Sequence, residues 1–172
     1  TNLPSIGSTC RSNQSAGTSI VSYTGNGVNN SSIAHNLNNK PSLILTKNLD
    51  GAYNWITYHS DLANTKVVAL DGSWGEFTPS GGYYGDITSS TYKVIQGSSN
   101  LTNLNNSGDR YISYCFAPVE GVSAMGVYTG SSDLPFVYTG FKVGFILLKR
   151  KDSNGDWVVH DTTRKPRNGT GD

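Results

Sequence analysis

Four aromatic side chains in a Gly- and Ser-rich stretch, residues 71–92, have the type and surroundings that suit ligand binding. An aromatic ring stacks on the apolar face of a pyranose, while Asn and Asp side chains bond its hydroxyl groups. The composition therefore makes Trp74, Tyr83, Tyr84 and Tyr92 candidates for a glycan-contact face. The alternative, which the sequence by itself favours, is a loop whose aromatic rings pack back onto the domain.

Three residues near the C-terminal end have the spacing of a calcium loop. Asp152, Asn154 and Asp156 stand at positions i, i+2 and i+4, where such a loop places oxygen ligands. The rest of the pattern is missing, because the sixth position holds Trp157 instead of Gly and the twelfth holds Thr163 instead of an acid. We therefore expect a plain hairpin turn here, without a metal or another cofactor.

Catalytic motifs are absent from the sequence. The three histidines, His35, His59 and His160, show no metal-ligand spacing, and none of HExxH, CxxC and GxSxG occurs. Glu76 and Glu120 are the only glutamates, and neither stands in a recognisable catalytic setting. The sequence therefore predicts that the protein is not an enzyme.

Charge and hydropathy argue against two kinds of partner. The 172 residues include 13 basic and 12 acidic side chains, and a formal net charge of +1 leaves no electrostatic footprint for nucleic acid. No apolar run approaches the length of about 18 residues that a membrane-spanning helix needs, so we expect no membrane insertion. Cys10 and Cys115 allow at most one disulfide, and whether they pair is open at this point.

Short strands are the elements that must position these residues. Ser, Thr, Asn and Gly make up 75 of the 172 residues and separate short runs rich in Val, Ile, Thr and aromatic residues. The expected strands are 19–24, 32–35, 42–47, 54–59, 66–70, 91–96, 109–116, 122–129, 136–141, 143–150 and 156–161. Their spacing predicts an all-β fold, an antiparallel β-sandwich of jelly-roll-like form.

An internal repeat gives two parts of the chain a common pattern. A Tyr-Thr-Gly triplet begins at Tyr23 and again at Tyr128, and a hairpin pattern follows each about twenty residues later. In each hairpin a Lys ends the first strand and a Trp eight residues later begins the second, namely Lys47 with Trp55 and Lys149 with Trp157. We predict that the structural core of both copies contains Tyr23, Trp55, Tyr128 and Trp157.

The second copy of the repeat is incomplete. About seventy residues separate the first Trp from the second triplet, whereas fifteen residues follow Trp157. We therefore expect an N-terminal arm or linker (1–18), a first β-sandwich unit (19–127) and a partial second repeat packed on the first (128–172). An incomplete sandwich leaves sheet edges that pair with another chain, which predicts a homo-oligomer. Whether the chain is a fragment of a longer protein is left open.

Several motifs in a fixed order resemble a known family. The series is GTSIVSYTGNG at 17–27, IAHNL at 33–37, LILTKN at 43–48, YISYCFA at 111–117 and PFVYTGF at 135–141. It resembles a β-rich domain of uncharacterised function found in tail-fibre-like and other particle-surface proteins of marine tailed bacteriophages. The resemblance implies no catalytic residue, and members of that family usually continue beyond the position of Asp172.

The resemblance also implies a function. The expected protein is a non-enzymatic bacteriophage virion structural protein at the virion surface, such as a tail fibre, a capsid decoration or a tail appendage. Its implied partners are copies of itself and other virion proteins, and a role in host attachment would add host surface glycans. The alternative is a carbohydrate-binding module of a viral or bacterial surface protein.

Overall fold

The regular structure of the protein consists of short antiparallel strands. The computed structural model describes residues 3–63, 65–80, 82–96 and 103–163, and within these ranges one 3-10 turn is the only helical element. The elements are β1 (Ser8–Asn13), η1 (Gln14–Ala16), β2 (Thr18–Thr24), β3 (Ser31–Ala34), β4 (Leu43–Asn48), β5 (Ile56–His59), β6 (Val68–Ala69), β7 (Gly82–Ile87), β8 (Thr91–Gln96), β9 (Arg110–Phe116), β10 (Phe145–Leu148) and β11 (Val158–Asp161). The predicted all-β antiparallel fold is confirmed.

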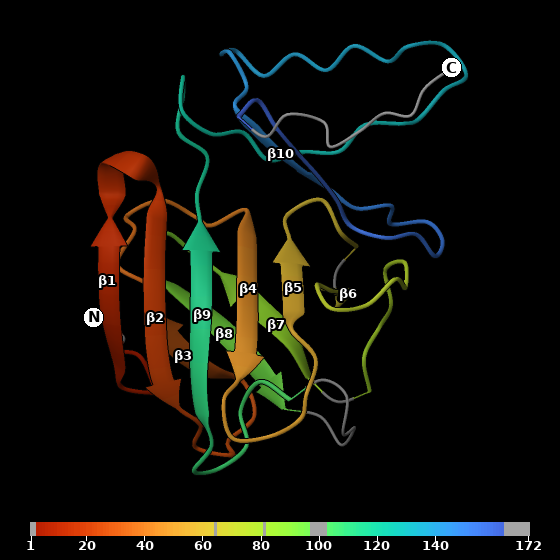
Figure 1. Ribbon diagram of the computed structural model, residues 1–172. Coiled ribbons are helices and arrows are strands. Elements are labelled where there is room, and N and C mark those ends of the chain that lie inside the picture. The colour runs from red at the N-terminus through yellow and green to blue at the C-terminus, as the bar shows by residue number, and fades with distance from the viewer. Residues whose placement is uncertain (1–2, 64, 81, 97–102, 164–172) are drawn as a thin grey trace.

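A six-stranded sheet forms the larger layer. Its strand order is β1-β2-β9-β4-β5-β6, so β9, which comes late in the sequence, stands between β2 and β4 and pairs with both (Figure 1). Side chains alternate between its two faces, as the two-residue period of a strand requires. In β2 the buried side chains are Ser19, Val21 and Tyr23, and the residues between them are exposed.

A three-stranded sheet, in the order β3-β8-β7, covers one face of the larger sheet (Figure 1). The core lies between the two layers, where Ile33, Tyr92 and Val94 of the smaller sheet belong to the same buried cluster as Ile44 and Ile56 of the larger one. Because both layers bury one apolar face against the other, the arrangement is a β-sandwich.

A two-stranded hairpin, β10–β11, forms a third sheet. It lies across one end of the sandwich and belongs to neither layer (Figure 1). Its strands pair antiparallel from Phe145 with Asp161 to Leu148 with Val158. The predicted partial second repeat therefore contains a real hairpin, although residues 164–172 of that range lie outside the described residues.

Residues 8–13 correct the predicted N-terminal arm. They form β1, which pairs with β2 over its full length, from Ser8 opposite Tyr23 to Asn13 opposite Thr18. The side chains of β1 alternate between half-buried and exposed, and none is fully buried. An edge strand of this kind needs no apolar run, so the sequence pattern missed it. Residues 1–2 of the predicted arm lie outside the described residues.

Two further predicted strands are absent from the described part of the structure, and one strand of the structure was not predicted. The runs 122–129 and 136–141 were expected as strands, but they contain no strand, because a segment with β propensity needs a neighbour to complete its hydrogen bonds. Conversely, β7 was not expected, because two glycines interrupt its pattern.

The two cysteines are free thiols. Cys115 is fully buried in β9, and this burial raises the pKa of its thiol well above the ordinary value. The Cys10 thiol donates a hydrogen bond to the carbonyl of Ala34 at 3.3 Å. Both side chains therefore act as small packing residues of the sandwich rather than as a covalent link.

Candidate functional site

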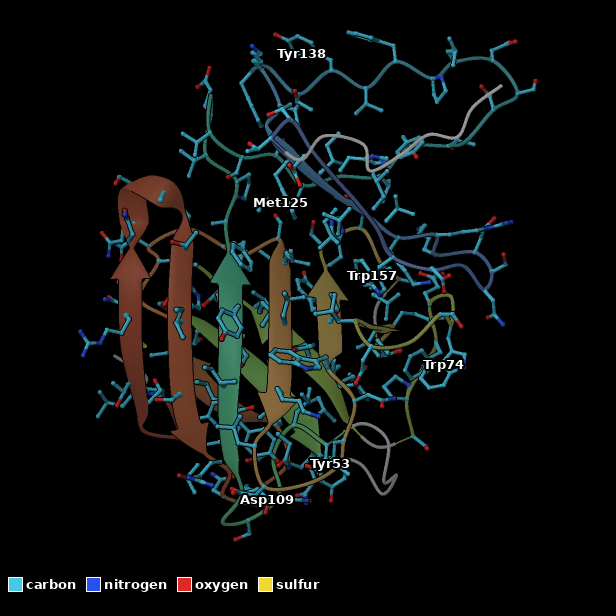
Figure 2. The ribbon with its side chains drawn as sticks, in the orientation of Figure 1. Tyr53, Trp74, Asp109, Met125, Tyr138 and Trp157 are labelled. Carbon is cyan, nitrogen blue, oxygen red and sulfur yellow. The ribbon has the colours of Figure 1, made fainter. Side chains whose placement is uncertain are left out.

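The β10–β11 hairpin and the chain that leads into it expose most of the large apolar side chains. Eleven of the sixteen exposed large apolar side chains among the described residues fall between 122 and 159. We call this set the hairpin surface: Val122, Val127, Tyr128, Leu134, Phe136, Val137, Tyr138, Phe145, Ile146, Val158 and Val159. Figure 2 shows Tyr138 far from the sandwich, beyond the hairpin. A monomer rarely leaves so large an apolar set uncovered, so this set is a candidate interaction surface.

Hydrogen bonds fix the loop end of the hairpin to the sandwich. The indole Nε1–H of Trp157 donates to the carbonyl of Ala69 at 2.8 Å, and Figure 2 shows Trp157 where the hairpin meets the sandwich. The Gly155 N–H donates to Ser73 O at 2.8 Å, and the Glu76 N–H donates to Lys151 O at 2.7 Å. These bonds hold the β10–β11 hairpin against the sandwich, so the part of the hairpin surface that lies on β10 and β11 is held in place.

A lysine organises the loop of each hairpin. The Lys47 ammonium donates to the carbonyl of Tyr53, and the Lys149 ammonium donates to the carbonyl of Gly155 at 2.6 Å. In both cases the acceptor lies six residues after the lysine. Lys149 also donates to Ser73 O at 3.1 Å, and partial burial lowers its pKa. The two loops that carry the Lys and Trp pattern therefore share one hydrogen bond at the same spacing.

The four predicted repeat residues do not have equivalent surroundings. Tyr23 is buried, stacks on Tyr111 with ring centroids 4.9 Å apart and donates to Leu104 O at 2.8 Å. Tyr128, its counterpart, is 50% exposed, so its assignment to a core is wrong. Trp55 and Trp157 are both half-buried. Trp55 packs against Tyr114 on the outer face of the six-stranded sheet, so it does not cross the sandwich.

A small cleft lies where residues 74–77 meet the β4–β5 loop and the β10–β11 loop. It has a volume of about 370 Å³ and is lined by Asn54, Trp74, Gly75, Glu76, Phe77 and Asn154. We call it the Trp74 cleft. The Trp74 side chain is 45% exposed, and Figure 2 shows it beside the loop end of the hairpin. Its size is at the lower end of the range of about 300–1,000 Å³ that is typical of small-molecule sites.

Packing holds the Trp74 ring in place. The Phe77 ring meets it edge to face, with centroids 6.2 Å apart and an interplanar angle of 81°. A Cβ atom at Gly72 would lie 2.9 Å from Trp74 Cε3, so only glycine lets the indole lie this close to the backbone. Because Phe77 and Gly72 both constrain the ring, Trp74 is a supported platform rather than a loose surface side chain.

Two side chains that line the Trp74 cleft each have one polar atom that is buried from solvent and has no hydrogen-bond partner among the described residues. They are the amide Nδ2 of Asn54, a donor, and the carboxylate Oε2 of Glu76, an acceptor. Leaving a buried polar group unpaired costs about 1–3 kcal/mol. Neither atom is accessible to water, so the polar character of the cleft comes from the lining side chains of Asn54, Glu76 and Asn154 as a whole.

Three of the four predicted glycan-contact residues do not form a contact face. Tyr84 and Tyr92 are buried in the core, as the alternative of rings packed back onto the domain expects, so they are not ligand platforms. Their hydroxyls donate to Thr46 Oγ1 at 2.7 Å and to Ser113 Oγ at 2.9 Å, and burial raises the pKa of both tyrosines. Tyr83 is half-buried and packs against the same cluster.

The predicted calcium-loop residues lie in the loop between β10 and β11. The Arg150 Nε–H donates to Asp152 Oδ1 at 2.7 Å and lowers the pKa of that carboxyl. Asn154 lines the Trp74 cleft. In the described parts of the chain, no group of three His, Cys, Asp or Glu side chains is placed to hold a metal ion.

A second hollow, of about 480 Å³, lies along the outer ends of β1, β2 and β9. Its strongest polar group is Arg110, whose guanidinium already donates to Asp50 Oδ1 at 2.5 Å. The side chains with hydroxyls around it, such as Ser8 and Ser22, show no comparable unpaired buried atom. The Trp74 cleft is therefore the better candidate for a ligand.

Sequence reasoning found Trp74 but missed the residues around it. The run 74–77 contains an aromatic residue, an acid and a second aromatic residue, and this local signal was available in the sequence. Asn54 and Asn154 carried no such signal. They come from loops 100 residues apart, and only the docking of β10–β11 on the sandwich brings them to one cleft.

One family model matches the chain. The family is described as a domain of unknown function (DUF7483), and the match covers residues 2–172. No curated protein and no solved structure matches the chain. Among the described residues, no helix has the length and apolar character to cross a membrane.

Proposed function

The chain belongs to the DUF7483 family, a domain family of unknown function, and from this premise we propose that it is a non-enzymatic assembly module of a phage virion surface protein. In this proposal the module associates with copies of itself through the hairpin surface. The observation that carries the proposal is the concentration of exposed apolar side chains on the positioned hairpin and the segment before it.

The magnitude of the available burial supports association. Complete burial of one Leu or Phe side chain contributes about 1.5–3 kcal/mol. Leu134 and Phe136 are 100% and 88% exposed, and nine further large apolar side chains lie on the same surface. Association costs an estimated 4–15 kcal/mol, so burial of even part of this set offsets the cost.

The charge of the surface supports a second copy of the chain as the partner. From residue 122 to residue 148, Asp133 and Lys142 are the only charged side chains. Two identical surfaces of this kind meet with little repulsion and few charges to desolvate. β10 has β11 as its only strand neighbour within the described chain, so its other edge is available to pair with a strand of the partner.

The virion assignment has a different support. It rests on the ordered motif series that resembles particle-surface domains of marine tailed bacteriophages. Appendages of such particles are symmetric assemblies, and this agrees with an apolar, nearly uncharged contact surface. Other virion proteins are further partners in this proposal.

The test compares two surface variants by sedimentation velocity over a micromolar concentration series. Phe136→Asp combined with Phe145→Asp places charge on the hairpin surface without touching the sandwich core. The control is Val28→Asp, an exposed apolar position outside the hairpin surface. We expect the parent protein and the control to form oligomers and the double variant to be monomeric. A parent protein that stays monomeric throughout the series would contradict the proposal.

A further inference from the structure

We propose that the Trp74 cleft binds a neutral pyranose, with Trp74 as the stacking platform and with Asn54 and Glu76 as the hydrogen-bonding groups. This site is separate from the hairpin surface, and it does not require self-association. Its residues differ from the aromatic set that the sequence predicted, because Trp74 is the only member of that set in the cleft.

The stacking half of the site is built by Trp74. Trp74 lines the cleft and is partly exposed, and its ring is held by Phe77 and by the close backbone at Gly72. The C–H groups on one face of a pyranose form a flat apolar patch that fits an indole face. Because the ring is already fixed, a sugar that stacks on it loses little affinity to the ordering of the side chain.

The polar half of the site consists of the Asn54, Asn154 and Glu76 side chains that line the cleft. The two amides offer donors and acceptors, and the Glu76 carboxylate offers acceptors. Adjacent hydroxyls of a pyranose serve both roles at once, since one hydroxyl accepts from the amide and its neighbour donates to the carboxylate. Bonds to an ionised carboxylate are among the stronger hydrogen bonds, so Glu76 is the group that we expect to contribute most of the polar affinity.

The charge of Glu76 decides which sugars fit. It is the only ionisable side chain that lines the cleft. A carboxylate favours hydroxyl donors and repels a second carboxylate, so acidic sugars such as uronic acids are disfavoured. The volume of about 370 Å³ suits one or two sugar rings rather than a long chain.

The fold keeps the cleft in shape through the docked hairpin. A Cβ atom at Gly75 would lie 2.8 Å from Lys151 O and 3.0 Å from Ser153 O, so glycine is required for the hairpin loop to approach. That approach brings Asn154 to the lining of the cleft. The site therefore exists only when both parts of the chain are assembled.

The experiment is an NMR titration of the full chain with methyl glycosides of glucose, galactose and mannose, and with methyl glucuronide as the acidic comparison. We expect saturable shifts of the Trp74 indole signal with at least one neutral sugar and at least tenfold weaker binding of the glucuronide. Trp74→Ala should abolish the saturable shift of neighbouring backbone signals. Glu76→Gln should weaken binding of the neutral sugar. It should also reduce the difference in affinity between the neutral sugar and the glucuronide.

Two controls keep the result interpretable. Tyr138→Ala removes an aromatic ring that is 82% exposed but lies outside the cleft, and it should leave binding unchanged. The combined Phe136→Asp and Phe145→Asp variant should also bind, which separates this proposal from self-association. Absence of saturable binding to all three neutral sugars, or binding that Trp74→Ala leaves intact, would overturn the inference.

Discussion

The hairpins β4–β5 and β10–β11 have related sequences and opposite surroundings. Ile44 in β4 is fully buried, whereas Ile146, the residue at the same place in β10, is 39% exposed. In both hairpins a lysine donates a hydrogen bond to the carbonyl six residues later. A tryptophan stands eight residues after that lysine. The two loops therefore share this hydrogen bond, and the hairpins differ in what each of them packs against.

The neighbouring strand explains the difference. In the sandwich, β9 lies between β2 and β4 and pairs with both of them. No strand within the described residues takes the corresponding place between 122–129 and β10. As a result 122–129, the counterpart of β2, forms no strand, and β10 keeps an open edge. A repeated hairpin pattern thus specifies the hairpin but not the sheet around it.

The largest expected effect on stability comes from replacing the isoleucine at the equivalent position of each hairpin, Ile44 or Ile146, by alanine. Ile44→Ala should lower the free energy of unfolding by about 2–5 kcal/mol, because it leaves a cavity in the core. Ile146→Ala should lower it by less than about 1 kcal/mol in the monomer, because the side chain is partly in water. Urea unfolding at low protein concentration measures both values.

Measurement at two protein concentrations extends the comparison of Ile44→Ala with Ile146→Ala. If the hairpin surface is covered in an oligomer, the Ile146→Ala variant should lose more stability at high protein concentration than at low. Equal losses for Ile44→Ala and Ile146→Ala in the monomer would show that the two hairpins are equally buried, and the comparison would then fail.

A smaller effect is expected at the contact between the two regions. Gly75→Ala places a Cβ atom 2.8 Å from Lys151 O, and because backbone must shift, we expect a loss of about 1–3 kcal/mol in hairpin docking. Gly155→Ala is the matched control, since its nearest contact is Arg150 Cβ at 3.4 Å. Hydrogen exchange of the β10–β11 amides should become faster in Gly75→Ala, while exchange in β4 should not change. Faster exchange in both regions would contradict a local effect.

The smallest expected effect is a dependence of the free energy of unfolding on pH, which arises from two histidines in the sandwich. His35 is fully buried, and burial lowers its pKa from the ordinary value of 6.5, although its hydrogen bond to Thr88 O opposes this. Its Nδ1 accepts from the Leu37 N–H at 3.3 Å, so protonation there also removes a bond. His59 in β5 has its pKa lowered by burial as well, with Asp61 opposing and Lys151 assisting.

The sign follows from the lowered pKa values. Both histidines contribute full stability above pH 6.5, and this contribution is lost as the pH falls below 6.5 toward their folded-state values. We expect a lower free energy of unfolding at about pH 5 than at about pH 7, before most carboxylates titrate. Urea unfolding at both pH values measures it, with NMR of the His35 ring to follow its protonation. Equal stability at the two pH values would show that burial of His35 has no such cost.

Much of the fold could be predicted from local pattern. The alternation of side chains in β2 and β9 and the Lys–Trp hairpins fixed the strands, because period and turn residues are local properties. Local pattern did not predict edge strand β1 or glycine-containing β7, because these strands form only through pairing with their neighbours. In the same way the burial of Tyr84 and Tyr92 could not be told from their neighbours in sequence. Both are aromatic residues among polar ones, and only the strand register turns them inward.

The amino-acid sequence by itself determined an all-β chain and two similar hairpins. These follow from local propensity and turn chemistry, which act over a few residues. The tertiary structure decided which hairpin is buried, and it brought Asn54, Glu76 and Trp74 together with Asn154. Burial depends on a neighbour such as β9, which follows β4 by more than sixty residues, and a cleft depends on how separate loops dock. Such long-range contacts leave no local signal in a single sequence.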